Sequence, residues 1–116
     1  MESLELANRI TDVIVDKQGE DVLILDLQEV TTFTDYFIIC TTTSRRQLDA
    51  LQGAVREAMK QEENYRVAMN VEGDAESGWI LLDYNSVIVH LFEQEMRDYY
   101  QLEELWKNAR IVARIQ

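Results

Sequence analysis

The fold of this chain is constrained most by the order in which two kinds of apolar pattern follow one another along its 116 residues. Short apolar runs bounded by polar turns are typical of β-strands, whereas apolar residues three or four positions apart are typical of amphipathic helices. Helical patterns at both ends and between the runs predict an α/β fold, a mixed β-sheet of about five strands flanked by helices. The strand runs cover residues 21–27, 36–41, 66–71, 79–84 and 87–92.

The five runs differ in how strongly they indicate strands. Residues 36–41 are almost entirely apolar, which predicts a central strand covered on both faces. Residues 66–71 alternate only weakly between apolar and polar side chains. The segment 72–78, EGDAESG, has the Gly, Asp and Ser content of an exposed connection. Residues 84–86 (Tyr-Asn-Ser) predict a short hairpin turn between the last two strands.

Three segments carry the spacing of amphipathic helices. The first covers residues 3–17 and has one apolar stripe. The second begins after Ser44, a residue type that caps helix N-termini well, and ends near Gln61. The third segment follows the last strand and carries its apolar residues on one face: Leu102, Leu105, Trp106, Ala109 and Val112.

The chain is long enough for one core and too short for two, so we expect a single domain over residues 1–116. Its core is expected to span about residues 3–107, with a short C-terminal tail that frays beyond Arg110. No apolar run approaches the roughly 20 residues of a membrane-spanning helix, and the N-terminus lacks the pattern of a secretory signal. The single cysteine, Cys40, permits no internal disulfide. These features predict a cytoplasmic protein.

The charge balance bears on the class of partner. There are 22 acidic and 11 basic residues, which gives a formal net charge of −11. Such a surface repels phosphate backbones and anionic lipids, so direct binding to DNA or to a membrane is disfavoured. It would attract a protein with a basic patch, although the charge could also serve solubility alone.

The residues that could support catalysis do not form a recognisable set. The lone histidine, His90, lies in the middle of a strand run, and we expect it to be a partly buried, hydrogen-bonded side chain. Cys40 is expected to be inert packing. Neither a glycine-rich phosphate loop nor a compact metal-ligand set is present. Asp21 and Asp26 are five residues apart and should point to opposite faces, so they do not match the paired carboxylates of a nucleotidyl transferase.

Large aromatic residues beside acids remain as candidates for a binding surface, because aromatic rings bury much area with little loss of entropy. Trp79 enters a strand from a polar loop, and interpretations as an interface residue and as a core residue both stay open. Helical spacing favours a core position for Trp106 and for one of Tyr99 and Tyr100.

Four sequence blocks, in this order and with matching separations, resemble the ribosomal silencing factor family, which is also called Iojap-like. The resemblance covers about residues 21–106. The blocks are TTFTDYFIICTTTSRRQ (31–47), EG (72–73), WILLDY followed by VIVHLF (79–92), and RDYYQLEELW (97–106).

The resemblance implies a fold related to nucleotidyl transferases but without their catalytic residues. It also implies a translational repressor that binds large ribosomal subunit protein fourteen where the small subunit would join, and so blocks subunit association when nutrients are scarce. No cofactor is implied, and free family members can form homodimers. Organelle relatives are linked to assembly of the large subunit, so an assembly factor stays open as an alternative, and an enzyme of the nucleotidyl transferase type stays open as a weaker one.

Two positions depart from the pattern of the family. Thr42 stands where the family usually has a glycine, which puts an unusual backbone conformation there in doubt. Asn85 and Ser86 stand where the hairpin usually reads Gly-Asp, which removes an acid that might have met the partner.

The resemblance and the aromatic pattern together predict where the partner binds. We expect Trp79, Asp83 and Tyr84 to make the contact, because they surround one hairpin. Their expected neighbours are Asp35, His90 and Tyr100, although Asp35 could instead cap a turn and Tyr100 could be a core ring.

Overall fold

The computed structural model describes residues 2–62, 68 and 70–115. Six strands form one sheet in the order β3-β4-β5-β2-β1-β6. Strands β2 and β5 pair in parallel and every other neighbouring pair is antiparallel, so the predicted mixed sheet is confirmed. The elements are α1 (Ser3–Asp16), β1 (Glu20–Asp26), β2 (Tyr36–Thr42), α2 (Arg45–Met59), β3 (Asn70–Asp74), β4 (Trp79–Asp83), β5 (Val87–Glu93), α3 (Gln94–Tyr100), α4 (Leu102–Leu105) and β6 (Arg110–Ile115).

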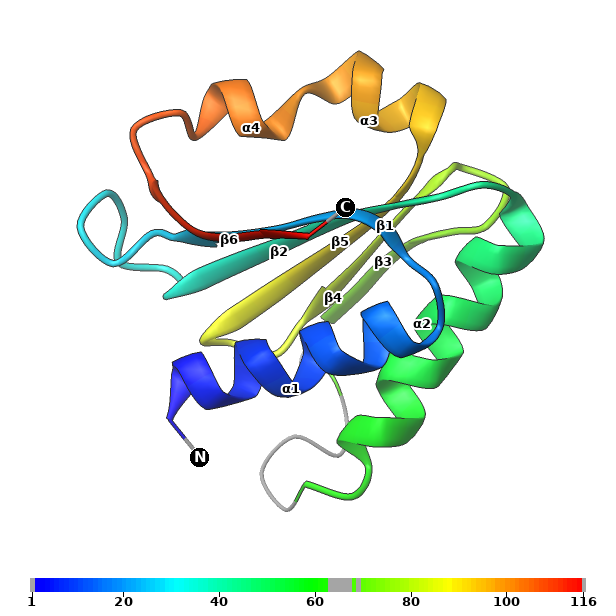
Figure 1. Ribbon diagram of the computed structural model, residues 1–116, viewed down its shortest axis with the longest axis horizontal. Helices are drawn as coiled ribbons and strands as arrows, with labels where there is room; N and C mark the ends of the chain where they lie inside the picture. The colour runs from blue at the N-terminus through cyan, green and yellow to red at the C-terminus, as the bar shows by residue number, and fades with distance from the viewer. Residues whose placement is uncertain (1, 63–67, 69, 116) are drawn as a thin grey trace.

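Helices α1 and α2 cover one face of the sheet (Figure 1). Their apolar stripes pack on alternate residues of the strands, because successive side chains of a strand point to opposite faces. Ser44 caps α2 as predicted, since its hydroxyl accepts a hydrogen bond of 3.1 Å from the backbone N–H of Gln47. The centre of this core contains Leu6, Ile10, Ile14, Ile24, Ile38, Leu48, Leu51, Val55, Leu82, Val89 and Leu91.

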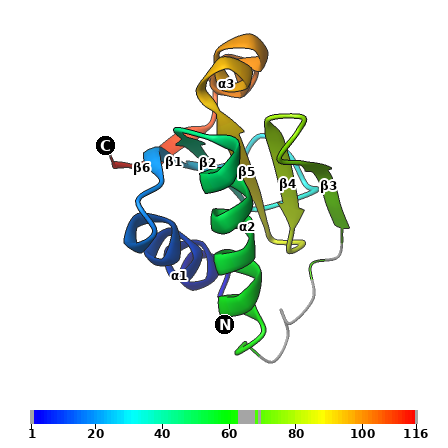
Figure 2. The ribbon, with the colours of Figure 1, turned by 90° about the vertical axis from the view of Figure 1, so that its right-hand side faces the viewer.

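Of the described helices, the short α3 and α4 lie on the other face of the sheet (Figure 1). Helix α3 packs against β5 and β2, while β3 and β4 lie to one side of it (Figure 2). A second apolar cluster lies on this face and contains Leu23, Leu25, Leu27, Phe37, Ile39, Ile88, Phe92 and Leu102. The face is therefore covered over β1, β2 and β5 and more open over β4.

Arg97 of α3 fixes the short helices to the sheet. Its side chain is 7% exposed, and its guanidinium donates hydrogen bonds to the backbone oxygen of Asp21 and, at 2.7 Å, to Oγ1 of Thr41. The Nε of Arg97 also donates to Oε2 of Glu103 in α4, at 3.2 Å. A charged group this deeply buried is stable only with such partners, so the contacts hold α3 and α4 at this end of the sheet.

The C-terminal segment differs from the prediction. We expected the helix to continue to Val112 and the tail to fray, but α4 ends at Leu105 and residues 110–115 form a sixth strand, β6. Strand β6 pairs antiparallel with β1. Without it, β1 would present a row of unpaired backbone groups, and pairing them outweighs the local helical spacing.

Strand β3 also lies elsewhere than predicted. The expected strand over residues 66–71 falls partly outside the described residues, and the observed strand, 70–74, extends into the segment that we predicted as a connection. Pairing with β4 overrides the glycine and aspartate content of that segment, because both Glu72 and Gly73 have partners in the ladder. The turn itself is shorter and lies between Asp74 and Trp79.

The two departures from the family pattern have simple structural consequences. Thr42 ends β2, is 1% exposed, and its hydroxyl donates to the carbonyl oxygen of Phe92 at 3.2 Å. Its φ is not positive, so no special conformation is required there. Asn85 adopts φ +72° in the predicted hairpin turn. Asparagine tolerates this left-handed conformation better than most residues, so it can replace glycine at low cost.

No helix within the described residues is both long enough and apolar enough to cross a bilayer.

Candidate functional site

Trp79 lies where the covered and open parts of the second face meet. Its ring stacks on Phe92 of the neighbouring strand, with centroids 5.1 Å apart and planes 22° apart. Tyr100, at the end of α3, also contacts the indole, with a centroid distance of 4.6 Å. The indole is half-buried: the sheet and α3 hold it, and one side stays open. This half-burial combines the two interpretations that the sequence left open.

His90, on the neighbouring strand β5, fixes the orientation of Trp79 through a hydrogen bond. The indole Nε1 of Trp79 donates a hydrogen bond of 3.2 Å to Nδ1 of His90. Because Nδ1 accepts, the proton of the neutral imidazole lies on Nε2. The side chain is 4% exposed, and burial lowers the pKa of His90 to about 3. Phe37 packs edge-on against the imidazole at 4.6 Å. His90 therefore acts as a neutral acceptor that occupies the only donor of the indole.

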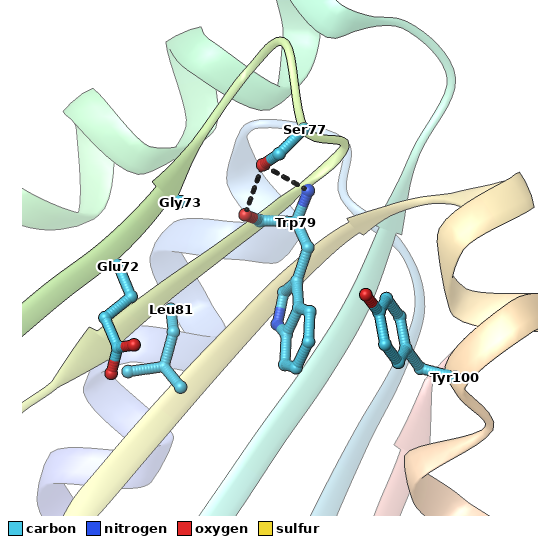
Figure 3. A pocket seen from close by; sticks show the side chains of 6 residues that line it. All are labelled: Glu72, Gly73, Ser77, Trp79, Leu81 and Tyr100. Carbon is cyan, nitrogen blue, oxygen red and sulfur yellow. Dashed lines mark hydrogen bonds between the residues drawn. The ribbon is translucent and has the colours of Figure 1, made fainter.

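A cavity of about 260 Å³ opens beside the indole, and we call it the Trp79 cavity. Figure 3 shows Trp79 and Tyr100 facing one another, with Leu81 and Glu72 farther along the sheet. The volume of the Trp79 cavity is below the roughly 300–1,000 Å³ typical of small-molecule sites. It is lined by Glu72, Gly73, Ser77, Trp79, Leu81 and Tyr100.

Gly73 brings the backbone of β3 close to Trp79. Its φ is +80°, and a Cβ atom at this position would overlap the carbonyl oxygen of Trp79. Ser77 secures the same turn, because its hydroxyl accepts from the N–H of Trp79 at 3.4 Å and lies 3.0 Å from the carbonyl oxygen (Figure 3). One wall of the Trp79 cavity is therefore formed by backbone, and only glycine fits there.

Three of the six predicted site residues come together: Trp79, His90 and Tyr100. Asp83 shares their face of the sheet but lies four residues along β4, roughly 13 Å from Trp79. Its carboxylate accepts a 2.7 Å hydrogen bond from the backbone N–H of Asn85, so it caps the hairpin turn.

The other two predicted residues lie away from the Trp79 cavity. Tyr84 is 2% exposed and packs in the core beneath α1 and α2, on the opposite face of the sheet. Asp35 precedes β2 at the far end of the sheet, roughly 20 Å along the strands from Trp79. Neither Tyr84 nor Asp35 therefore lines the Trp79 cavity.

The sequence reasoning missed Glu72, Gly73, Ser77 and Leu81. Alternation along β4 could have placed Leu81 beside Trp79, because residues two apart share a face. Glu72 and Gly73 match a family block, but their composition predicts a connection. The sequence therefore did not predict that they pair with β4 and line the cavity.

The large aromatic residues that follow β5 are less buried than their helical spacing predicts. Trp106 was expected in the core, but it is only half-buried and packs edge-on against Phe37 at 5.4 Å. The prediction that one of Tyr99 and Tyr100 belongs to the core is wrong, because they are 75% and 42% exposed. Helix α3 is only seven residues long and is held through Arg97, so Tyr99 stays exposed and Tyr100 is only partly covered, by Trp79.

Asp26 and Cys40, which the sequence offered as candidates for chemistry, do not line the Trp79 cavity. Among the described residues, no group of three or more His, Cys, Asp or Glu side chains could hold a metal ion. The Asp26 carboxylate is paired with Arg110 at 3.1 Å. Cys40 is fully buried, and burial raises the pKa of its thiol to about 12, so it is the unreactive thiol that we expected.

The chain matches the family model described as ribosomal silencing factor during starvation over residues 1–116. It is 37% identical over 94 residues to the ribosomal silencing factor RsfS of Bacillus subtilis, which covers 81% of this chain and 78% of that protein. It is 27% identical over 101 residues to the mouse protein named mitochondrial assembly of ribosomal large subunit protein 1, which covers 84% of this chain and 43% of that protein.

A solved structure shares the fold. The crystal structure of a protein from Chromobacterium violaceum superimposes with a TM-score of 0.86 at 31% identity, covering 92% of this chain and 88% of that chain. The expected relation to nucleotidyl transferases stays a prediction.

Replacing Gly73 with alanine should destabilise the protein by about 2 kcal/mol or more, because its φ is positive and the new Cβ would meet the backbone of Trp79. Gly53 provides a matched control. It lies in α2 with open space around it, so Gly53→Ala should stabilise by about 0.5–1 kcal/mol. Urea unfolding measures both changes, and equal effects of the two substitutions would refute the role of Gly73.

His90 should remain neutral in the folded protein well below its ordinary pKa. The chain contains one histidine, so a single pair of imidazole C–H signals can be followed by NMR. Their chemical shifts should stay constant from pH 8 to pH 5, because burial disfavours the charged form. Since the unfolded chain does bind this proton below about pH 6.5, the contribution of His90 to stability should fall as the pH drops. A folded-state titration near pH 6.5 would contradict the burial.

Proposed function

Because this chain belongs to the ribosomal silencing factor family, we propose that it represses translation by binding the large ribosomal subunit and blocking its association with the small subunit. The proposed partner is large ribosomal subunit protein fourteen, at the face where the small subunit would join. The proposed setting is the cytoplasm, and the proposed mechanism is steric, so it requires no turnover and no cofactor.

The half-open Trp79 cavity is the observation that carries this proposal. Interface hot spots are enriched in Trp and Tyr that lie in pockets and are held rigidly. Trp79 meets this description, because Phe92 supports its ring and His90 orients it. Tyr100 adds a second ring that is 42% exposed. A partner that covers these rings would bury aromatic area at little cost in entropy, since the indole is already ordered.

The net charge of −11 supports a basic partner. A field of this sign accelerates the encounter with a basic surface more than it strengthens the final complex. Affinity is then expected to depend mainly on the rings around the Trp79 cavity.

Assembly of the large subunit is a second candidate function. It is favoured by the mouse relative, whose name refers to mitochondrial assembly of the large ribosomal subunit. An assembly factor would bind the same subunit but would leave before translation, so binding alone does not separate the two functions.

The homodimer implied by the resemblance also stays a prediction.

Reassociation of isolated ribosomal subunits, followed on a sucrose gradient, tests the proposal. An excess of the protein should reduce the fraction of joined ribosomes. Trp79→Ala should weaken binding to the large subunit at least about 30-fold, because loss of an interface hot spot costs about 2 kcal/mol or more. It should therefore restore joining.

Two further variants make this test specific. Tyr100→Ala should weaken the block as well, and the exposure of Tyr100 makes unfolding of this variant unexpected. Leu4→Ala is the control, because Leu4 is similarly exposed, at 41%, but lies on α1 on the other face. If ribosomes join equally well with and without the protein, the silencing function is wrong, and binding without a block would favour assembly.

A further inference from the structure

The side chains around the Trp79 cavity offer hydrogen-bond acceptors but few donors. The indole N–H of Trp79 is already donated to His90. The hydroxyl of Ser77 lies 2.8 Å from the carbonyl oxygen of Asp74 and is committed to the turn. What remains is the carboxylate of Glu72 and the hydroxyl of Tyr100. A ligand that must accept hydrogen bonds, such as a phosphate or a carboxylate, would find little there.

The one charged side chain among the described residues that line the Trp79 cavity is acidic, Glu72. Residues 70–83 contain no lysine or arginine. Glu72 pairs with Leu81, and Asp74 pairs with Trp79, in the antiparallel ladder. Side chains directly opposite one another in such a ladder point to the same face, so both carboxylates lie on the face of the cavity.

The Glu72 carboxylate is exposed, and it accepts a hydrogen bond of 2.8 Å from the side-chain amide of Asn70. Among the described residues, no lysine or arginine lies within salt-bridge distance of Glu72. Arg45 pairs instead with Glu76 and Glu93. The carboxylate can therefore bind a cation that another molecule supplies.

The aromatic rings favour the same kind of ligand. The faces of Trp79 and Tyr100 carry partial negative charge, which attracts an ammonium or guanidinium group lying over them. A guanidinium is also planar, so it can lie against a ring while its N–H groups point to a carboxylate.

We propose that the Trp79 cavity receives a basic side chain of the ribosomal partner, which lies against Trp79 and Tyr100 and pairs with the carboxylate of Glu72. This inference rests on the proposed function, because it names the group that the large subunit would place in the site. It assigns a role to Glu72 in the choice of partner. An apolar side chain would fill the aromatic part of the cavity and leave the carboxylate without a role.

Equilibrium binding of the full chain to isolated large subunits, measured by co-sedimentation, tests the inference. Glu72→Gln keeps the shape of the side chain and its hydrogen bond from Asn70, and removes only the charge. It should weaken binding roughly fivefold, the upper end for loss of one exposed ion pair. Glu57→Gln is the matched control, because Glu57 is an exposed acid on α2, on the other face. It should bind within about twofold of the wild type.

A double-mutant cycle with Tyr100 tests whether the ring and the carboxylate hold the same group. Tyr100→Leu should weaken binding more than Tyr100→Phe, because only phenylalanine keeps the aromatic face. The double variant Glu72→Gln/Tyr100→Leu should lose less affinity than the product of the two single fold losses, because the two side chains contact the same cation.

The outcomes separate this inference from the proposed function. If the wild type binds large subunits and Glu72→Gln binds as tightly as Glu57→Gln, the basic side chain is wrong and the proposed function stands. Tighter binding by Glu72→Gln would indicate an apolar or acidic occupant and would overturn the inference too. If the wild type does not bind large subunits, the proposed function fails and the inference fails with it.

Discussion

A six-stranded sheet has two faces to cover, and this chain supplies long helices for only one of them. Helices α1 and α2 have 14 and 15 residues and bury their apolar stripes on the same face. After β5 only short helices remain, of seven and four residues. Arg97 holds these helices over β1 and β2 through Asp21 and Thr41. The part of the second face that β4 contributes is left open, and the candidate site lies there.

The position of Trp79 at this boundary explains its properties. The ring is supported by Phe92, oriented by a neutral His90 and approached by Tyr100, yet one side remains available. Burial lowers the pKa of His90 and so favours the neutral imidazole, which accepts the indole N–H and holds Trp79 in place. The arrangement provides rigid aromatic area and nearby carboxylates, which suits the docking of a basic macromolecule.

Local patterns were sufficient to predict most of the sheet and the two long helices. The apolar run of β2, the cap at Ser44 and the hairpin turn at Asn85 depend on neighbours in the sequence, and each was predicted correctly. Strand β6 was not, because its formation depends on the free edge of β1, more than 80 residues earlier in the chain. The position of β3 depends in the same way on its ladder with β4.

The candidate site was predicted only in part, for the same reason. The sequence identified Trp79, His90 and Tyr100, but the contacts that join them run between β4, β5 and α3. Tyr84 follows Asp83 directly, and the two side chains lie on opposite faces, so nearness in sequence was misleading. Glu72 enters the site only through its pairing with Leu81.

The central claim is that the large subunit binds on the open part of the second face, around Trp79. Hydrogen–deuterium exchange of the protein, alone and with an excess of isolated large subunits, measures this directly. Exchange should slow in residues 70–83 and 94–100, which surround the Trp79 cavity, and should stay unchanged in α1 and α2 on the other face. Slower exchange confined to α1 and α2, with none in residues 70–83, would contradict the account.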